Sequence, residues 1–173
     1  MKMPEKIESE RLVLIPISQK YAKVIFHEFT EDITTFMFPA SPKVIGETEA
    51  YINSEIEKRA AGTSFAVVVV DKLTNEFIGC SGVHHIDTET PETGVWIKKS
   101  AQGNKYGLEA VGALVSWANE NLKYIYVTYP VDKENIPSKK IPDALGGIIE
   151  DEYKLETPSG KILDCVEYRI FKK

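Results

Sequence analysis

Cysteine is scarce in this sequence: Cys80 and Cys165 are the only two, and they lie far apart. Two isolated cysteines predict neither a disulfide framework nor a zinc site. A disulfide framework needs several cysteines, and a zinc site needs several ligands, at characteristic spacing. We therefore expect no metal and a reducing, cytoplasmic compartment.

Long apolar runs are also missing. The longest, residues 65–70, suits a buried strand and falls far short of the roughly 20 residues that a membrane span needs. The N-terminal segment MKMPEKIESER is charged and lacks the apolar stretch of a secretory signal. The sequence therefore predicts no membrane partner.

Positive charge is in deficit, with 21 Lys and Arg against 26 Asp and Glu, which gives a net charge of −5. This balance argues against a nucleic-acid partner bound through a broad basic surface, and it is compatible with a cationic substrate such as an amine. The motifs G-x-S-x-G, H-E-x-x-H, C-x-x-C and GxxxxGK[ST] are all absent. The serine-hydrolase, zinc-protease, thioredoxin-like and P-loop signatures are thereby excluded.

What is present is the composition of an ordinary globular protein, with 43% hydrophobic and 27% charged residues in a chain of 173. Residues 1–173 are expected to form one mixed α/β domain. The run at 65–71 is too apolar to alternate, which predicts a strand buried on both faces. Apolar periodicity and turn residues predict strands at 11–17, 65–71, 76–86, 92–97, 124–129, 148–156 and 161–171, with helices after Ser18, from about Glu47 to a stop at Gly62, and from near Lys105, and a short helical piece before the last two strands.

The stretch SAQGNKYGLEA, residues 100–110, carries two glycines in a loop that runs directly into a helix. A helix N-terminus has unpaired N–H groups and roughly half a positive charge, and glycine lets an anion approach the backbone closely. The loop by itself fits two interpretations: a phosphate site, or a tight turn that packs closely under a helix.

Longer segments separate these interpretations. FIGCSGVHHIDTETPETGVWIKKSAQGNKYGLEA resembles the centre of a Gcn5-related N-acetyltransferase (GNAT) of the ribosomal-protein-alanine, RimJ/RimL-like type. ESERLVLIPI is similar to the first strand of that family, and VDKENIPSKKIPDALGG to its later Asn-x-x-small and Leu-Gly stretch. The resemblance covers nearly the whole chain in the right order. It implies a single-domain fold with a mixed, mostly antiparallel twisted sheet flanked by helices.

The resemblance also implies acetyl-CoA as co-substrate. The strand before the loop would offer backbone groups of Trp96 and Ile97 to the pantetheine arm, and Asn135 and Ser138 would lie near the pantetheine and thiol. The family's middle loop glycine is Lys105 here, which costs about 1 kcal/mol if the position needs a positive φ. The pyrophosphate cradle would consist of Gln102, Gly103, Asn104, Lys105, Tyr106 and Gly107.

For the chemistry, the resemblance points to Glu92 as the base that removes a proton from the amine, with a solvated strand-end carboxylate as the alternative. His84 and His85 are the next candidates for the base, because histidine in general titrates near neutral pH, with a structural surface or core histidine as the alternative for each. Neighbouring strand residues point to opposite faces, so at most one of the two can face a cleft. Ser138 would protonate the leaving thiolate; the alternative is a helix cap.

Two departures from the family weaken this part of the resemblance. Pro142 stands where other subfamilies carry a tyrosine acid, and Gly147 replaces an aromatic residue. Tyr129 is a substitute donor. The sequence thus predicts an acetyltransferase, a monomer or homodimer, whose amine acceptor is a protein N-terminus or a small amine. A coenzyme-binding module without catalysis and an interaction protein on the same scaffold remain as rivals.

Overall fold

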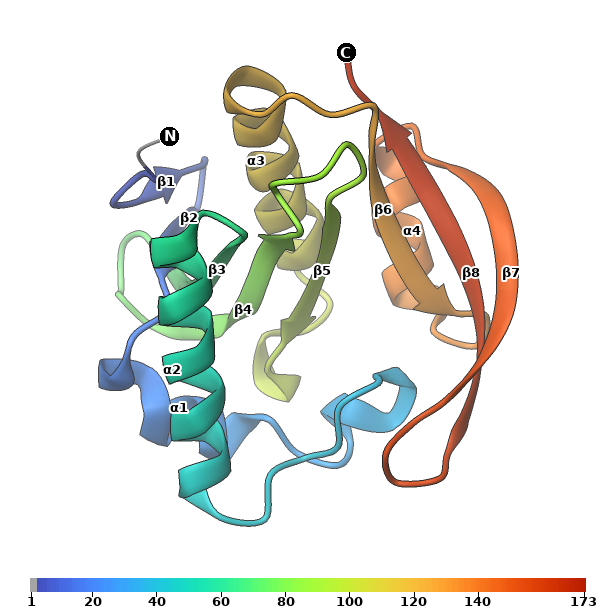
Figure 1. Ribbon diagram of the computed structural model, residues 1–173. Helices are drawn as coiled ribbons and strands as arrows, with labels where there is room; N and C mark the ends of the chain where they lie inside the picture. Colours follow the sequence, from blue (N-terminus) through green and yellow to red (C-terminus); the bar gives the residue numbers. More distant parts are fainter. Residues whose placement is uncertain (1–2) are drawn as a thin grey trace.

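The computed structural model describes residues 3–173, whose centre is an eight-stranded sheet flanked by helices (Figure 1). The strand order is β1-β2-β3-β4-β5-β6-β8-β7, and every neighbouring pair is antiparallel except β5 and β6. This arrangement confirms the predicted mixed α/β class with a mostly antiparallel sheet. The strands are β1 (Ile7–Glu8), β2 (Leu12–Pro16), β3 (Ser64–Asp71), β4 (Phe77–His84), β5 (Glu92–Ile97), β6 (Tyr126–Asp132), β7 (Ile148–Glu156) and β8 (Ile162–Phe171).

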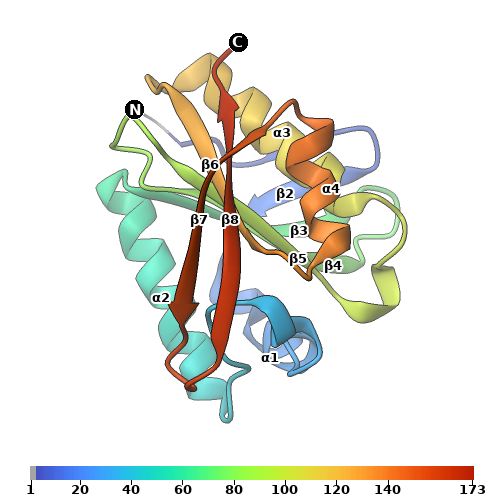
Figure 2. The ribbon, with the colours of Figure 1, turned by 90° about the vertical axis from the view of Figure 1, so that its right-hand side faces the viewer.

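Helices cover both faces of the sheet, with α1 (Ala22–Glu28) and α2 (Ile45–Ala61) on one side and α3 (Tyr106–Asn121) and α4 (Ile136–Ala144) on the other (Figure 2). Alternate residues of β3 divide between the two resulting cores. Phe65 and Val67 pack with Leu114 of α3, whereas Ala66 and Val68 pack on the side of α1 and α2. The prediction that this strand is buried on both faces is therefore confirmed.

Helix ends follow the sequence signals at one place and depart from them at another. Gly62 ends α2 with φ 75°, the left-handed conformation that glycine adopts without steric cost. The prediction that Ser18 caps a helix with its side chain was wrong. Its carbonyl accepts from the N–H of Tyr21 in a short 3₁₀ turn, no side-chain cap bond forms, and α1 begins only at Ala22.

The parallel strands β5 and β6 pair at one position only, Glu92 with Thr128, and Figure 1 shows them diverging below this point. The strand predicted to end at Tyr129 in fact continues to Asp132 and includes Pro130. The N–H of Lys172 donates to the carbonyl of Ile125, and alternation from that bond directs the backbone of Pro130 away from β8 and toward β5. Because proline has no N–H, the ladder between β5 and β6 cannot extend there, and Pro130 therefore helps to separate the two strands.

Candidate active site

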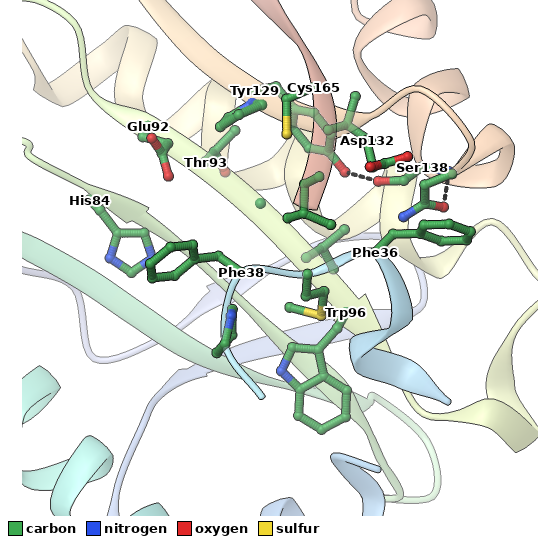
Figure 3. Close-up of a pocket in the computed structure, with 18 of the residues that line it drawn as sticks. Phe36, Phe38, His84, Glu92, Thr93, Trp96, Tyr129, Asp132, Ser138 and Cys165 are labelled. Atoms are coloured by element: carbon green, nitrogen blue, oxygen red, sulfur yellow. Dashed lines mark hydrogen bonds between the residues drawn. The ribbon is translucent and has the colours of Figure 1, made fainter. Parts of the chain in front are cut away.

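A cavity of about 540 Å³ lies where β5 and β6 separate (Figure 3). One wall consists of the ends of β4 and β5, with His84, Glu92 and Trp96. The opposite wall comes from β6 and the start of α4. The hairpin β7–β8 and the loop after the 3₁₀ turn η2 (Ile33–Phe36) complete the enclosure. The separation of the strands thus creates a site with an unpaired strand edge along one side.

That strand edge belongs to Val95 and Ile97. Lys98 donates its N–H to the carbonyl of Ile78 in β4, and alternation from this bond directs the backbone of Trp96 toward β4. A Cβ placed on Gly79 of β4 would lie 2.1 Å from the Trp96 carbonyl oxygen, which places that oxygen against β4. The backbone of Trp96 is therefore occupied within the sheet, contrary to the expectation that it is free, whereas the backbone of Ile97 faces the gap.

The Trp96 side chain lines the cavity and packs on Phe29 and Phe77, with ring centroids 4.8 and 5.8 Å away. Gln102 donates its side-chain amide to the carbonyl of Ile97 at 3.0 Å. The N–H of Ile97 and the backbone of Val95 thus remain as the hydrogen-bonding groups of this edge.

The glycine-bearing loop presents a run of unpaired backbone donors at the start of α3. Across the described residues 3–173, no protein acceptor is found for the backbone N–H groups of residues 103–108. Gly103 and Lys105 both have positive φ, 84° and 61°. A Cβ on Gly107 would approach the Ile141 side chain to 3.0 Å, so this glycine lets α3 pack closely against α4. The loop therefore serves both close packing and the exposure of N–H groups.

Arg11, the residue immediately before β2, holds this loop from its outer side. Its guanidinium donates to the carbonyl of Asn104 at 2.9 Å and to the carboxylate of Glu109 at 2.7 Å, and it lies 4.5 Å from the centroid of the Tyr106 ring. The Asn104 side chain donates to the carbonyl of Ala101 at 3.1 Å. The interaction of Arg11 with Glu109 was not predicted, because it joins residues 98 positions apart.

Lys105 adopts the left-handed conformation, and this leads to a prediction about stability. Lys105→Gly should be about 1 kcal/mol more stable than Lys105→Ala. Any Cβ costs roughly 1–2 kcal/mol at positive φ, whereas the extra freedom of unfolded glycine returns about 0.5–1 kcal/mol. Urea unfolding of the two variants measures the difference. Equal stabilities would mean that position 105 relaxes to a negative φ whenever glycine is absent.

On the far wall, the hydroxyl groups of Tyr129 and Ser138 are hydrogen-bonded at 2.7 Å. Burial raises the pKa of Tyr129 to about 12, against a smaller lowering by the Ser138 hydrogen bond, so this phenol keeps its proton at neutral pH. The alternative role of Ser138 as a helix cap was wrong: Asn135 is the N-cap of α4, and its side-chain oxygen accepts from the Ser138 N–H at 3.4 Å. The Ser138 hydroxyl is therefore available to the cavity.

Glu92 is the carboxylate of the near wall. Burial, and less strongly Glu167, raise its pKa above the ordinary glutamate value, against a lowering by His85. No hydrogen bond or ion pair of its carboxylate is found among residues 3–173. A half-buried carboxylate without a partner is a suitable proton acceptor at neutral pH.

Of the two histidines, His84 lines the cavity and His85 does not. His84 is the last residue of β4 and the cross-strand neighbour of Glu92. His85 lies in the following turn with φ 53° and is exposed.

Other residues that line the cavity were not predicted from the sequence as part of the site. Phe36 and Phe38 lie in a segment for which the sequence predicted neither a strand nor a helix, and Tyr51 lies on α2. Both cysteines, Cys80 and Cys165, also line the cavity as free thiols. Within the described part of the chain, no group of three or more His, Cys, Asp or Glu residues could hold a metal ion, and no helix is long and apolar enough to cross a membrane.

Comparison with known proteins places this geometry in a family. The sequence model of the acetyltransferase (GNAT) domain matches residues 11–148, most of the chain. An uncharacterized N-acetyltransferase, p20, from Bacillus licheniformis is 24% identical, over 98% of this chain and 97% of its own.

Two solved structures share the fold at low sequence identity. RimL, a ribosomal L7/L12 alpha-N-protein acetyltransferase in complex with coenzyme A, has a TM-score of 0.86 at 16% identity, covering 96% of this chain and 98% of its own. The microcin C7 self-immunity acetyltransferase MccE, in complex with acetyl-CoA and AMP, has a TM-score of 0.85 at 17% identity, covering 98% and 97%. The sheet of this chain opens between β5 and β6, next to a loop of free N–H groups. Together with the match to the family model, this shows that the chain belongs to the GNAT family of acetyl-CoA-dependent acyltransferases.

Proposed function

We propose that this protein transfers the acetyl group of acetyl-CoA to a primary amine, which is either a protein N-terminus or a small amine. The observation that carries the proposal is the run of free N–H groups at residues 103–108, placed next to an unpaired strand edge that leads into the cavity. Such donors at a helix N-terminus suit a pyrophosphate, and an unpaired strand edge suits an amide-containing arm.

The residues fit the coenzyme in order along this edge. The loop of Gln102, Gly103, Asn104, Lys105, Tyr106 and Gly107 would hold the pyrophosphate through backbone N–H groups. Val95 and Ile97 would pair with the pantetheine arm, in place of the Trp96 and Ile97 backbone that the sequence predicted. Asn135 and Ser138 would then lie near the thioester end. The coenzyme A complex of RimL and the acetyl-CoA complex of MccE support acetyl-CoA as the co-substrate.

The chemistry is direct attack of the amine on the thioester carbonyl. Glu92 accepts a proton from the ammonium group, which frees the nitrogen lone pair for attack. Ser138 gives its hydroxyl proton to the thiolate as the C–S bond breaks, and the protonated Tyr129, hydrogen-bonded to it, returns a proton to the serine oxygen and is reprotonated from solvent. The two groups line opposite walls of the cavity, and Figure 3 shows them on separate sides.

The amine character of the acceptor is supported by the charge of the cavity. Glu92 and Asp132 are among its lining residues, whereas no lysine or arginine of the described chain is. The carboxylate of Asp132 is already hydrogen-bonded within the protein, since its two oxygens accept hydrogen bonds from the N–H groups of Glu134 and Asp164, both at 2.9 Å. Glu92 is therefore the carboxylate that can attract a cationic amine. The activity of RimL on a ribosomal protein favours a protein N-terminus as the first acceptor class to test.

Acetyl-CoA should stabilise the purified protein. At a concentration about 100 times Kd, binding to the folded state adds roughly 2.7 kcal/mol, which for a chain of this size raises the melting temperature by roughly 5–11 °C. Acetyl-pantetheine, which lacks the pyrophosphate, should give a smaller rise at the same concentration. The measurement is a thermal melt with and without each ligand. An unchanged melting temperature with saturating acetyl-CoA would mean that the loop is a turn that does not bind the coenzyme.

Free CoA release with a panel of amines completes the test. The panel should contain short peptides with free N-termini, the same peptides with blocked N-termini, polyamines and amino sugars. Release with a free amine and none with the blocked peptide supports the proposal. Binding without release from any amine would support a coenzyme-binding module instead, and absence of binding would support an interaction protein on this scaffold.

A further inference from the structure

Behind the cavity wall, His84 is connected to a buried carboxylate through a serine. The Nδ1 atom of His84 lies 2.8 Å from the Ser64 hydroxyl, and that hydroxyl donates to Glu55 at 2.7 Å. Glu55, on α2, is 2% exposed, and its other oxygen accepts from Lys58 at 2.7 Å. These four residues come from α2, β3 and β4 and form one hydrogen-bonded chain from the cavity to the protein surface.

The direction of these bonds fixes which nitrogen of His84 carries the proton. Burial by itself would raise the pKa of Glu55, but hydrogen bonds from Lys58 and Ser64 and, at the low pH where Glu55 titrates, the charge of protonated His84 hold it below its ordinary value, so at neutral pH Glu55 is a carboxylate that only accepts. Ser64 has one hydroxyl proton, and it goes to Glu55. Ser64 can therefore only accept from His84, which requires the proton on Nδ1 and leaves the lone pair on Nε2.

Nε2 lies on the cavity side of the ring. A Cβ placed on Gly82, which lines the cavity, would be 3.1 Å from this atom. Glu92 is the cross-strand neighbour of His84. Figure 3 shows His84 and Glu92 on the side of the cavity away from Ser138.

The reaction itself needs two proton acceptors. An ammonium group loses one proton before attack and a second from the nitrogen of the tetrahedral adduct. One proton is returned to the sulfur, and one leaves to solvent. Glu92 provides the first acceptor under the proposed function, on which this inference rests.

We propose that the Nε2 atom of His84 is the second proton acceptor of the transfer, and that Ser64 and Glu55 are positioning residues that hold His84 in the required tautomer. In this step an N–H bond of the adduct breaks, its electron pair stays on nitrogen, and an N–H bond forms at Nε2. The resulting imidazolium keeps its Nδ1–H bond to Ser64 and is stabilised by the negative charge of Glu55.

The charged groups around His84 determine how the step responds to pH. Burial lowers the pKa of His84 below its ordinary value, Glu55 opposes this, and Lys58 and His85 add to it. Glu92 faces it from β5. His84 is consequently neutral and able to accept a proton at pH 7.

The test compares kcat and kcat/KM against pH for the wild type, Ser64→Ala, Glu55→Gln and His84→Gln, with His27→Gln as the control at an exposed histidine on α1. His84→Gln should lower kcat roughly 100-fold, a typical contribution of a proton-transfer group. The variants should keep the wild-type melting response to acetyl-CoA. Loss of the Ser64 acceptor or the Glu55 charge destabilises the imidazolium, so the acidic limb of the profile should move to lower pH in both variants. Ser64→Ala leaves the Glu55–Lys58 pair intact. If this variant folds and the acidic limb of its pH profile stays at the wild-type pH, the proposal is overturned.

A readout independent of activity separates this inference from the proposed function. In protein labelled with ¹⁵N at histidine, the imidazole nitrogens of His84 should show a protonated Nδ1 and an unprotonated Nε2 above its titration. Ser64→Ala should shift this pattern toward the other tautomer. A proton on Nε2 in the wild type would overturn the inference, whether or not any amine is acetylated. If His84 shows the expected tautomer but the protein releases no CoA with any amine, the proposed function is overturned and the arrangement of Glu55, Ser64 and His84 is not.

Discussion

Glu92→Gln should lower turnover at pH 7 by roughly 10²–10⁴-fold, the usual contribution of a positioned proton-transfer group. Glutamine keeps the size and position of the side chain at the start of β5 but cannot accept the proton of an ammonium group. The melting response to acetyl-CoA should stay unchanged, because Glu92 lies away from the loop of residues 102–107. Initial rates of CoA release with the best amine of the panel measure the effect.

The same variant provides its own control for folding. Because burial raises the pKa of Glu92 above its unfolded value, its contribution to stability is lost as pH rises through the folded pKa. Removal of the charge should therefore leave the melting temperature at pH 7 the same or higher. Glu89→Gln, which removes an equal charge from an exposed position three residues away, should keep wild-type turnover. Unchanged turnover in folded Glu92→Gln would remove this carboxylate from the mechanism.

Gly79→Ala should destabilise the protein by roughly 3 kcal/mol or more, at the upper end of what an added methyl group costs in a packed interior. The new Cβ would lie 2.1 Å from the Trp96 carbonyl oxygen, a backbone atom that cannot move without separating β4 from β5. A loss of this size lowers the melting temperature of a chain of this length by roughly 6–12 °C. Thermal and urea unfolding measure it.

Gly94→Ala is the matched control, because Gly94 lies on the partner strand β5 and a Cβ there would meet nothing within 4 Å. It should unfold close to the wild type. If Gly79→Ala were as stable as Gly94→Ala, the close approach of β4 to the Trp96 carbonyl would not be a feature of the folded protein. The assignment of the Val95 and Ile97 backbone to the gap would then lose its main support.

The local sequence pattern was sufficient to predict those features that depend on a single strand or helix. The apolar run that became β3, the stop of α2 at Gly62 and the glycine-bearing start of α3 were all predictable, because burial period and positive-φ preference act within a few residues. The same local reasoning misplaced the end of β6. Pro130 indicated a break in a central strand, yet its missing N–H faces the gap to β5, where no ladder bond is lost.

The sequence by itself determined the order of the helices and of strands β2 to β8, but not the short strand β1, together with the family resemblance and the loop of backbone donors, because these depend on short-range propensity and spacing. Only the tertiary structure decided which histidine enters the cavity, that Ser64 and Glu55 meet His84, and that Arg11 reaches Glu109. Strand register has a period of two, so a shift of one residue would exchange every inward side chain for an outward one. Contacts between distant residues depend on that register, and no local pattern encodes it.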